Sequence, residues 1–448
     1  MKTGRSVVSV FLVLVLMLAI MTGCSTNDDF NEVQPTQESS ASDESVNEVA
    51  TEESTQEKIT LNFWNGFTGP DGEVLKEIVN RFNEAHKDSI EIKMDVMGWD
   101  VLAQKLPTAM MTDTAPEMVL MIGDWIPQYL ANDNFQDLDD FWSVTGLEEE
   151  SYLKNVLDLG KFEDSYYSLP MQFNLIYLYW NKILFEEAGL DPNSPPATMD
   201  ELADYAVLLT DPSINQYGLA LPVKGAPQYW TSFFWNNGGE LFNLETKESL
   251  LNSPENIATL EWIDDLAEKG VSPIGSTGAE LDNLFMSGKL GMVINGPWLI
   301  NGIKSNNIDF GITAPPAGSE RQEVIAGSIG FCIPSGVDQA HKEAAYEFIE
   351  FWMSDEIIKE WSVRNGFPAW SHNVIADEEV MNDPVLGAIS PLSELGRGYN
   401  PEAFEGISAI DGDALWPMIE AVIVGDDEPA DIIKITSDEI DNIFSQYK

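Results

Sequence analysis

Short stretches near the start of the chain alternate hydrophobic and polar residues, and longer stretches with a helical period lie between them. KITLNFW, for example, places Ile59, Leu61 and Phe63 on one face, as a β-strand does. Two more strands are predicted at SIEIKMDVM and EMVLMI. Helices are predicted between them, at GPDGEVLKEIVNRFNEAH and WDVLAQKLPTAMMTD, because their hydrophobic residues recur every three or four positions. This alternating order predicts a parallel sheet with crossover helices.

The same alternation returns further along the chain. The later predicted strands are NLIYLYW, YGLALPV, KLGMVIN, DFGITAP and SIGFCIP. A helix at NKILFEEAGL is predicted to end at Gly189, and the pair Thr198 and Glu201 predicts a capping box for the next helix. The rest of the chain is predicted to be mostly helical, with short breaks at Gly366, Pro384 and Pro401. The fold class is therefore α/β.

The N-terminus has the pattern of an export signal. Lys2 and Arg5 precede the apolar run VVSVFLVLVLMLAIM, and Thr22-Gly23-Cys24 follows it. This arrangement resembles a bacterial lipobox, which predicts a signal peptide at 1–23 and a lipid on Cys24. A plain membrane-anchor helix is the alternative. In either case the protein is expected on the extracellular face of the cytoplasmic membrane.

A polar, acidic segment follows the export signal. Residues 24–57 contain almost no large apolar side chains, so they are predicted to form a disordered tether. The whole chain of 448 residues has 75 acidic and 23 basic residues, a net charge of −52. Such a surface repels nucleic acid and anionic lipid, and it argues against a polyanionic ligand.

Motifs for metal, cofactor or nucleophilic chemistry are missing from the sequence. The chain has three His residues without metal-ligand spacing, and it has no HExxH, CxxC or phosphate-binding glycine pattern. AGSIG lacks the first glycine of GxSxG. If Cys24 is acylated, Cys332 is left alone and no internal disulfide can form. We therefore expect no catalytic residue, no metal and no cofactor.

Tryptophan is the positive signal, with 13 in the chain. Several are predicted at strand ends or turns beside Asn, Asp, Gln or Gly, in NFWNG, GWD, GDW, QYW and GPW. An aromatic face beside amide and carboxylate groups suits a sugar ring, whose C–H face stacks while its hydroxyls bond the polar groups. Packing remains the alternative for each of them taken alone. The members of this set are Trp64, Trp99, Trp125, Trp230, Trp298 and Trp416.

The order of these motifs resembles family 1 extracellular solute-binding proteins, the receptors of carbohydrate ABC importers. The resemblance begins with ITLNFWNGFTGPDG, GWDVLAQKLPTAM, APEMVLMIGDWIPQYL and SLPMQFNLIYLYWNKILFEEAGLDP. It continues in the same order through GKLGMVINGPW, GSIGFCIPSG, RNGFPAW and DALWPMIEAVIVGD. Residues 58–448 are covered.

The resemblance implies a two-lobed periplasmic-binding-protein fold of type II with the ligand cleft between the lobes. The first lobe is expected at 58–170 plus 327–372, and the second at 171–326 plus 373–448. It also implies a monomeric, non-catalytic receptor that captures a carbohydrate, expected to be an oligosaccharide, and delivers it to the importer permease.

The site residues are expected to follow from the matching motifs. Asp124 and Trp125 match the strand-helix edge that holds sugar hydroxyls, and Trp298 and Trp416 resemble stacking tryptophans of the family. Trp298 follows a predicted strand in INGPWLING, at the edge where open α/β sheets bind ligands. The full set of expected ligand-binding residues is Trp64, Asn65, Asp100, Asp124, Trp125, Gln172, Asn174, Tyr229, Trp230, Gly296, Trp298, Ser328, Arg364 and Trp416.

Two other functions remain open at this stage. A surface-anchored glycoside hydrolase would also have an aromatic cleft, but it needs two carboxylates that flank the scissile bond. A receptor for glycerol phosphate would need cationic anchors, for which Arg364 is the main candidate. The family often carries an acidic residue where this chain has Gln172, so the pattern of hydroxyls that it recognises stays open.

Overall fold

The computed structural model describes residues 58–162, 164–223, 227–400 and 404–447. The predicted signal peptide at 1–23, the predicted lipidation at Cys24 and the predicted tether at 24–57 lie outside the described residues. Within the described ranges, no helix is long and apolar enough to cross a membrane.

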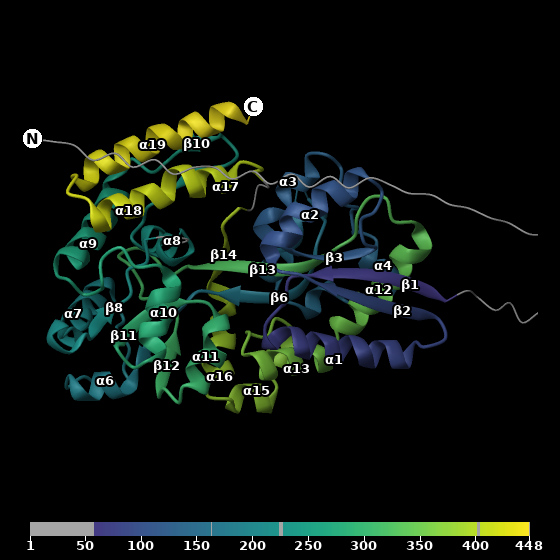
Figure 1. Cartoon of the computed structure of the whole chain (residues 1–448), viewed down its shortest axis with the longest axis horizontal. Coiled ribbons are helices and arrows are strands. Elements are labelled where there is room, and N and C mark those ends of the chain that lie inside the picture. Colours follow the sequence, from purple (N-terminus) through teal and green to yellow (C-terminus); the bar gives the residue numbers. More distant parts are fainter. Residues whose placement is uncertain (1–57, 163, 224–226, 401–403, 448) are drawn as a thin grey trace, which may run out of the picture. The chain divides into compact units, whose positions relative to one another are not determined.

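The first sheet has the strand order β14-β13-β3-β1-β2, and β6 pairs with the other edge of β13 (Figure 1). Pairing of β1 with β2 and with β3 is parallel, which confirms the predicted parallel arrangement. β13 runs antiparallel to β3 and β6 and parallel to β14. The strands are β1 (Ile59–Asn65), β2 (Ile90–Val96), β3 (Met118–Ile122), β6 (Leu169–Leu175), β13 (Val324–Cys332) and β14 (Gly396–Gly398).

Helices cover this sheet because each has one apolar face. α1 begins with a proline and two acidic residues in its first turn, which suits a helix N-terminus, and it buries Leu75, Ile78 and Phe82. The larger helices here are α1 (Pro70–Ala85), α2 (Trp99–Met111), α12 (Gln339–Trp352) and α13 (Asp355–Asn365). The smaller elements are α3 (Pro127–Leu130), α4 (Phe141–Thr145), α5 (Lys154–Leu157), β4 (Lys161–Phe162) and β5 (Ser165–Tyr166).

The second sheet has the strand order β12-β7-β11-β8. β7 is antiparallel to both β11 and β12, and β11 is parallel to β8. Its strands are β7 (Tyr177–Asn181), β8 (Tyr217–Leu219), β11 (Leu290–Asn295) and β12 (Phe310–Thr313). The helices of this region are α6 (Lys182–Glu187), α7 (Met199–Leu209), α8 (Pro227–Asn236), α9 (Pro254–Glu268), α10 (Gly278–Met286) and α11 (Ile300–Ser305). A small hairpin joins β9 (Phe242–Asn243) and β10 (Glu248–Ser249).

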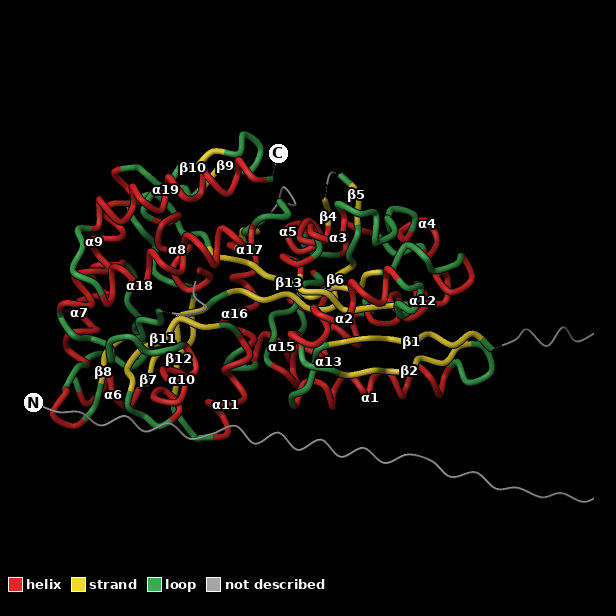
Figure 2. Tube along the Cα trace, turned by 45° about the horizontal axis from the view of Figure 1, so that its top comes forward, coloured by secondary structure: helices red, strands yellow, loops and turns green. Residues whose placement is uncertain are grey.

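Two paired strands connect the sheets, and both views show β6 and β13 side by side (Figures 1 and 2). β6 ends at Leu175 and β7 begins at Tyr177, so a single residue separates the two sheets along the chain. NLIYLYW was predicted as one strand, but the chain changes sheets inside it. The first part of this segment therefore belongs to β6 and the last part to β7.

The C-terminal part is mostly helical, as predicted, and also contains the short strand β14, which the pattern did not indicate. Its last two helices, α18 and α19, pack against each other and against α9. The helices are α14 (His372–Ile375), α15 (Glu378–Asn382), α16 (Leu386–Ile389), α17 (Ile407–Ala409), α18 (Trp416–Val424) and α19 (Pro429–Gln446). A π-helical turn, η7 (Ile410–Leu415), joins α17 to α18.

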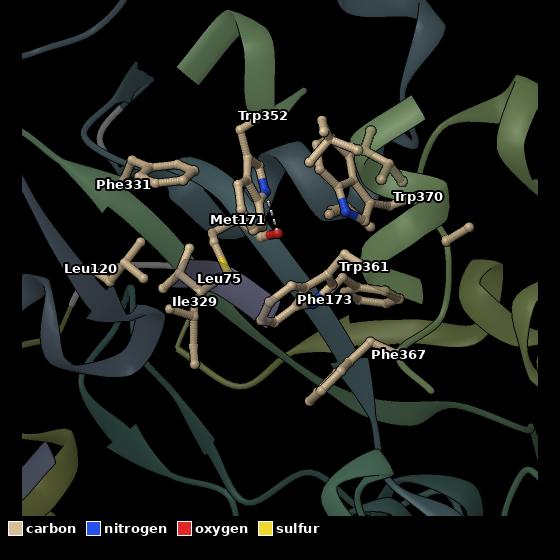
Figure 3. Close-up of a cluster of buried hydrophobic side chains, with 14 of the residues drawn as sticks. Leu75, Leu120, Met171, Phe173, Ile329, Phe331, Trp352, Trp361, Phe367 and Trp370 are labelled. Atoms are coloured by element: carbon tan, nitrogen blue, oxygen red, sulfur yellow. Dashed lines mark hydrogen bonds between the residues drawn. The ribbon is translucent and has the colours of Figure 1, made fainter. Parts of the chain in front are cut away.

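A large aromatic core lies against the first sheet. Trp352 and Trp361 of α12 and α13 are fully buried there together with Trp370, and Figure 3 shows them around Met171 and Phe173 of β6. The indole N–H of Trp352 donates a 2.8 Å hydrogen bond to the Met171 carbonyl, so this buried donor is satisfied. β6 is thereby fixed to the helices of the first sheet.

Candidate functional site

A cavity of about 220 Å³ lies at one end of the first sheet. Its polar lining includes Asp124 after β3, Asn155 of α5, Lys161 of β4, Ser328 of β13 and Tyr399 after β14. Apart from Asn155 and Lys161, which are six residues apart, these side chains are distant in the sequence, so the fold brings them together. A few convergent polar groups in a concave surface are typical of a ligand site.

Asp124 lies in the single turn η1 (Gly123–Trp125) that follows β3. β3 is parallel to β1, so Asp124 is at the carboxyl end of parallel strands, where open α/β sheets bind ligands. The turn runs close to β13, and a Cβ on Gly123 would come within 2.8 Å of Ser328 Oγ. The Asp124 side chain is exposed to solvent at the cavity, yet the protein around it displaces part of the water from the carboxyl, and this desolvation raises its pKa to about 6.

A second carboxyl, that of Asp411, is hydrogen-bonded to the cavity-lining Tyr399 and was not predicted from the sequence. The Tyr399 hydroxyl donates a 2.5 Å hydrogen bond to Asp411 Oδ1. Burial and the negative charge of Asp124 raise the pKa of Asp411 to about 7, although the bond from Tyr399 acts in the opposite direction. Asp411 lies in η7, and such π-helical turns are frequent at functional sites.

Trp298 lies in the short helical turn Pro297–Leu299 that follows β11, and 48% of its surface is exposed. Its ring lies over Gly296, where a Cβ would come within 2.2 Å of the indole, so any other residue there would displace the ring from this position. The buried Tyr179 of β7 holds this turn, because its hydroxyl donates a 2.8 Å hydrogen bond to the Gly296 carbonyl. Asn295 accepts a 2.8 Å bond from the Gly296 N–H and donates a 2.6 Å bond to Asp282. The sequence INGPWLING thus forms a hydrogen-bonded turn that presents an exposed indole.

Trp416 is the first residue of α18, directly after η7, and 41% of its surface is exposed. Trp298 and Trp416 are the tryptophans that stand out as exposed in the described part of the chain. Neither indole lines the 220 Å³ cavity itself. Trp298 lies in the helical turn after β11, and Trp416 begins α18 after a π-helical turn. An apolar face of this size is costly to leave in water.

Several other predicted residues lie at or near the carboxyl ends of the strands. Trp125 packs edge-to-face on Trp99 at 6.2 Å, and Asp100 is exposed in the first turn of α2. Asn174 of β6 is half-buried against Gly327 of β13. Asp100, Trp125 and Asn174 remain predictions as ligand contacts.

Two predicted side chains are buried polar groups with an unsatisfied atom. Asn65 accepts a 3.2 Å bond from the Phe67 N–H, but its Nδ2 has no partner within the described structure. Gln172 Oε1 likewise has no hydrogen-bond partner there. A ligand or a movement of the chain could satisfy them, so both remain predictions.

The structure places three predicted residues elsewhere. Trp64 is only 8% exposed and packs in a core cluster beneath the Lys105 ammonium, which is 4.1 Å from its ring. Trp230 is 3% exposed in the core of the second region, and its indole N–H donates to the Pro222 carbonyl at 3.2 Å. Trp64 of β1 and Trp230 of α8 both point toward the core from their elements, so both side chains pack inside the protein.

Arg364 is also outside the cavity. It lies on α13 and forms ion pairs with Glu77 of α1 at 2.7 Å and with Glu360 at 2.9 Å. These carboxylates raise the pKa of Arg364, and Arg364 lowers that of Glu77. Tyr229, on the half-buried side of α8, lies near Gly278 of α10, where a Cβ would be 3.5 Å from its hydroxyl.

Of the predicted residues, Asp124 and Ser328 line the cavity. The sequence did not indicate the other polar lining residues Asn155, Lys161 and Tyr399, nor Asp411, which is hydrogen-bonded to Tyr399. No group of three or more His, Cys, Asp or Glu in the described ranges is placed to hold a metal ion.

Residues 77–388 match the family of bacterial extracellular solute-binding proteins. The chain belongs to this family. Its members are non-catalytic receptors, so the hydrolase alternative is set aside, and the predicted family and fold class are confirmed. The same membership assigns an extracellular or periplasmic location in an ABC transport system.

Three relatives show how broad the family is. A binding protein of Brucella abortus (strain 2308) is 26% identical over 401 residues, which covers 87% of this chain and 93% of the relative. The maltotriose-binding protein of Pyrococcus abyssi is 24% identical over 289 residues, which covers 64% of this chain and 61% of the relative. The sn-glycerol-3-phosphate-binding periplasmic protein UgpB of Escherichia coli (strain K12) is 22% identical over 324 residues, with 69% and 73% covered.

Two solved structures share the fold. A solute-binding protein of an ABC transporter from Thermotoga lettingae, bound with α-D-tagatose, has a TM-score of 0.75 at 23% identity and covers 86% of this chain and 100% of its own. The cyclic α-maltosyl-1,6-maltose binding protein of Arthrobacter globiformis has a TM-score of 0.76 at 20% identity, with 87% and 100% covered. At these identities the likeness shows the fold.

Proposed function

We propose that this protein captures a carbohydrate, in particular an oligosaccharide, and delivers it to the permease of an ABC importer. The observation that carries the proposal is the exposure of Trp298 and Trp416, at 48% and 41% of their surfaces, each in the first turn of a helical segment. Sugar rings bind such faces through their C–H groups. The sugar-binding names of the Pyrococcus abyssi and Arthrobacter globiformis proteins support the same class of ligand.

The polar groups of the cavity would then bind the hydroxyls. Asp124 and the amide of Asn155 can accept hydrogen bonds, and Ser328 and Tyr399 can both donate and accept them. The cavity of about 220 Å³ is smaller than most sites for whole ligands, so the remaining rings of an oligosaccharide would lie against the tryptophans.

Closure of two lobes completes the proposed mechanism. The lobes are those expected from the sequence, 58–170 plus 327–372 and 171–326 plus 373–448, and the paired strands β6 and β13 would form the hinge. Because few chain segments cross between the two sheets, a small rotation there would close the site around a ligand.

Glycerol phosphate is the second candidate, because UgpB of Escherichia coli is a relative. The local charges count against it. Arg364 is engaged with Glu77 and Glu360, and the cavity contains Asp124 and Asp158 against the single basic residue Lys161. An anionic ligand would therefore meet net negative charge.

The lipid anchor at Cys24 is part of the same proposal, supported by the lipobox-like Thr22-Gly23-Cys24. Cys24→Ser should release the protein from membranes after signal cleavage. Mutant protein that still fractionates with membranes would contradict the anchor and leave the ligand proposal intact.

A thermal-shift screen on residues 56–448, which form one compact unit, tests the ligand class. Maltotriose, other neutral oligosaccharides, monosaccharides and sn-glycerol-3-phosphate would be compared. A ligand at 100 times its Kd stabilises the protein by about 2.7 kcal/mol, which is easily detected as a higher Tm. We expect a neutral oligosaccharide to give the largest shift. A response to sn-glycerol-3-phosphate alone would contradict the proposal.

A further inference from the structure

A second cavity, of about 290 Å³, lies next to the first one. Gly398 and Tyr399 line both cavities, so the end of β14 and the residue after it form the wall between them. Tyr399 is fixed in this wall, because its hydroxyl donates a 2.5 Å hydrogen bond to Asp411 and its ring packs edge-to-face on Phe242 at 5.7 Å. The two cavities are therefore neighbours on either side of one well-supported side chain.

The hairpin of β9 and β10 forms the opposite wall of this second cavity. Phe242 and Asn243, the two residues of β9, both line it and are both half-buried. Asn243 Oδ1 accepts a 3.0 Å hydrogen bond from the Thr246 N–H, whereas Asn243 Nδ2 donates no hydrogen bond to any other described residue. An aromatic ring beside a free amide donor is the same combination that suits a sugar ring and its hydroxyls.

The charged groups of the second cavity are already paired with one another. Arg397 is bound to Glu240 at 2.7 Å and its guanidinium lies 4.2 Å from the Trp235 ring, while Arg321 donates a 2.6 Å bond to the same carboxylate. Burial acts to raise the pKa of Glu240, but the bonds from Arg397 and Arg321 outweigh it and lower the pKa. Glu240 is therefore an ionised acceptor in a fixed position, and its charge is compensated within the wall. Exposed Glu245 adds only negative charge, which favours an uncharged ligand over an anion.

We propose that the second cavity is a further subsite for the same uncharged oligosaccharide, which passes Tyr399 and places one more sugar unit against Phe242 and Asn243. The inference rests on the proposed carbohydrate function. The first cavity, of about 220 Å³, is small for a whole oligosaccharide, and the second one offers about 290 Å³ directly beside it. In this subsite Asn243 Nδ2 donates to a sugar oxygen and Glu240 accepts from a hydroxyl.

The consequence of such a subsite is a preference for longer chains. A short sugar occupies the first cavity alone, whereas a longer chain also gains an aromatic contact and hydrogen bonds beyond Tyr399. Two or three contacts of this kind correspond to an affinity about tenfold higher for the longer chain. The length preference, rather than the affinity for any one sugar, is therefore the signature of the second cavity.

The test is titration calorimetry with maltose, maltotriose, maltotetraose and maltohexaose on the wild type and two variants. Leu250→Trp fills the second cavity from a position that is 40% exposed, so the fold should tolerate it. Asn243→Ala removes the free amide donor. The wild type should bind maltohexaose about tenfold more tightly than maltose. Leu250→Trp should abolish this difference and Asn243→Ala should reduce it by about fivefold, while the affinity for maltose changes less than about twofold.

Glu248→Ala is the matched control, because Glu248 is exposed in β10 of the same hairpin and lies outside the cavity. It should keep the full length preference of the wild type. A crystal structure with maltohexaose gives an independent measurement that needs no variant. We expect a sugar unit within hydrogen-bond distance of Asn243 and Glu240, and a chain that leaves the first cavity without passing Tyr399 would overturn the proposal.

These measurements separate the inference from the proposed function. If the wild type binds short and long chains equally, or if both variants lose affinity for maltose and maltohexaose alike, the carbohydrate function stands and the second subsite is overturned. If no member of the series binds, the carbohydrate function fails for these sugars and the subsite fails with it.

Discussion

Two groups of tryptophans in this molecule occupy opposite environments. Trp352, Trp361 and Trp370 are buried in the core beside β6, whereas Trp298 and Trp416 expose 48% and 41% of their surfaces. The buried group is held by helices and by ring contacts, such as Trp352 to Trp361 at 5.3 Å. The exposed group stands on a glycine turn and a π-helical turn. The same side chain thus stabilises the fold in one region and is available to a ligand in the other.

The largest effect is expected from Trp352→Ala in the buried group. Removal of this side chain leaves a cavity and an unpaired Met171 carbonyl, and it should lower the free energy of unfolding by about 3–5 kcal/mol. Denaturant unfolding of ligand-free protein measures it. Trp352→Phe, which keeps most of the volume, is the control and should cost less. A loss below about 1 kcal/mol for Trp352→Ala would contradict the claim that the buried tryptophans stabilise the fold more than the exposed ones do.

The exposed group should show the opposite behaviour. Trp416→Ala should weaken sugar binding about thirtyfold, or about 2 kcal/mol, because an aromatic anchor is lost. The free energy of unfolding should change by less than about 1 kcal/mol, since the side chain is largely in solvent. Trp416→Phe keeps an aromatic face and should retain most of the affinity. Titration calorimetry and unfolding on both variants decide the question.

The pH dependence of stability sharpens the contrast between core and site. The pKa values of Asp411, Asp124 and Asp282 are raised to about 7, 6 and 6, so the folded state binds protons that the unfolded state releases. Their contribution is full below about pH 4 and is lost as the pH rises toward 7. The wild type should therefore lose free energy of unfolding between pH 5 and pH 8. Asp411→Asn should lose about 1 kcal/mol less, a figure reduced because solvent partly screens Asp411.

Other acidic groups with lowered pKa values change stability in the opposite direction, so the wild-type pH profile alone does not isolate Asp411. The free energy of unfolding is therefore measured by denaturant at pH 5 and pH 8 for wild type, Asp411→Asn and the exposed control Asp413→Asn, and the pH-dependent change is compared between the three proteins. Identical pH profiles for all three proteins would show that Asp411 is not desolvated in the folded state.

The smallest effect is expected from Arg364→Ala. Its ion pairs with Glu77 and Glu360 lie at the surface, and such pairs contribute roughly 0–1 kcal/mol each. Affinity for any ligand should stay the same, because Arg364 is outside the cavity. A loss of sn-glycerol-3-phosphate binding in this variant would revive the predicted role of Arg364 as an anionic-ligand anchor.

Much of the fold could be predicted, because alternation and helical period record which face of each element is buried. The parallel pairing of β1, β2 and β3 was predicted for this reason. The change of sheets inside NLIYLYW was not, since both parts are equally apolar. The contact between Tyr399 and Asp411 depends on a π-helical turn, which leaves no simple pattern in a single sequence.

The site residues show the same division. Trp298 could be placed by its turn, because Gly296 and the preceding strand fix its position. Trp230 was misplaced by its polar neighbours, although its spacing to Phe233 and Phe234 on one helix face indicated burial. Arg364 was proposed from the matching motif as a cationic anchor, although Glu360 stands four residues before it, the spacing of a helical ion pair.

The most direct test of the receptor account is paired calorimetry on Trp298→Ala, with a ligand titration and a melt of the ligand-free protein. The account predicts an affinity about thirtyfold lower for the sugar that stabilises the wild type most, with a nearly unchanged ligand-free Tm. Unchanged affinity with a Tm lowered as for a core cavity of about 3–5 kcal/mol would contradict it and return Trp298 to the packing of the fold.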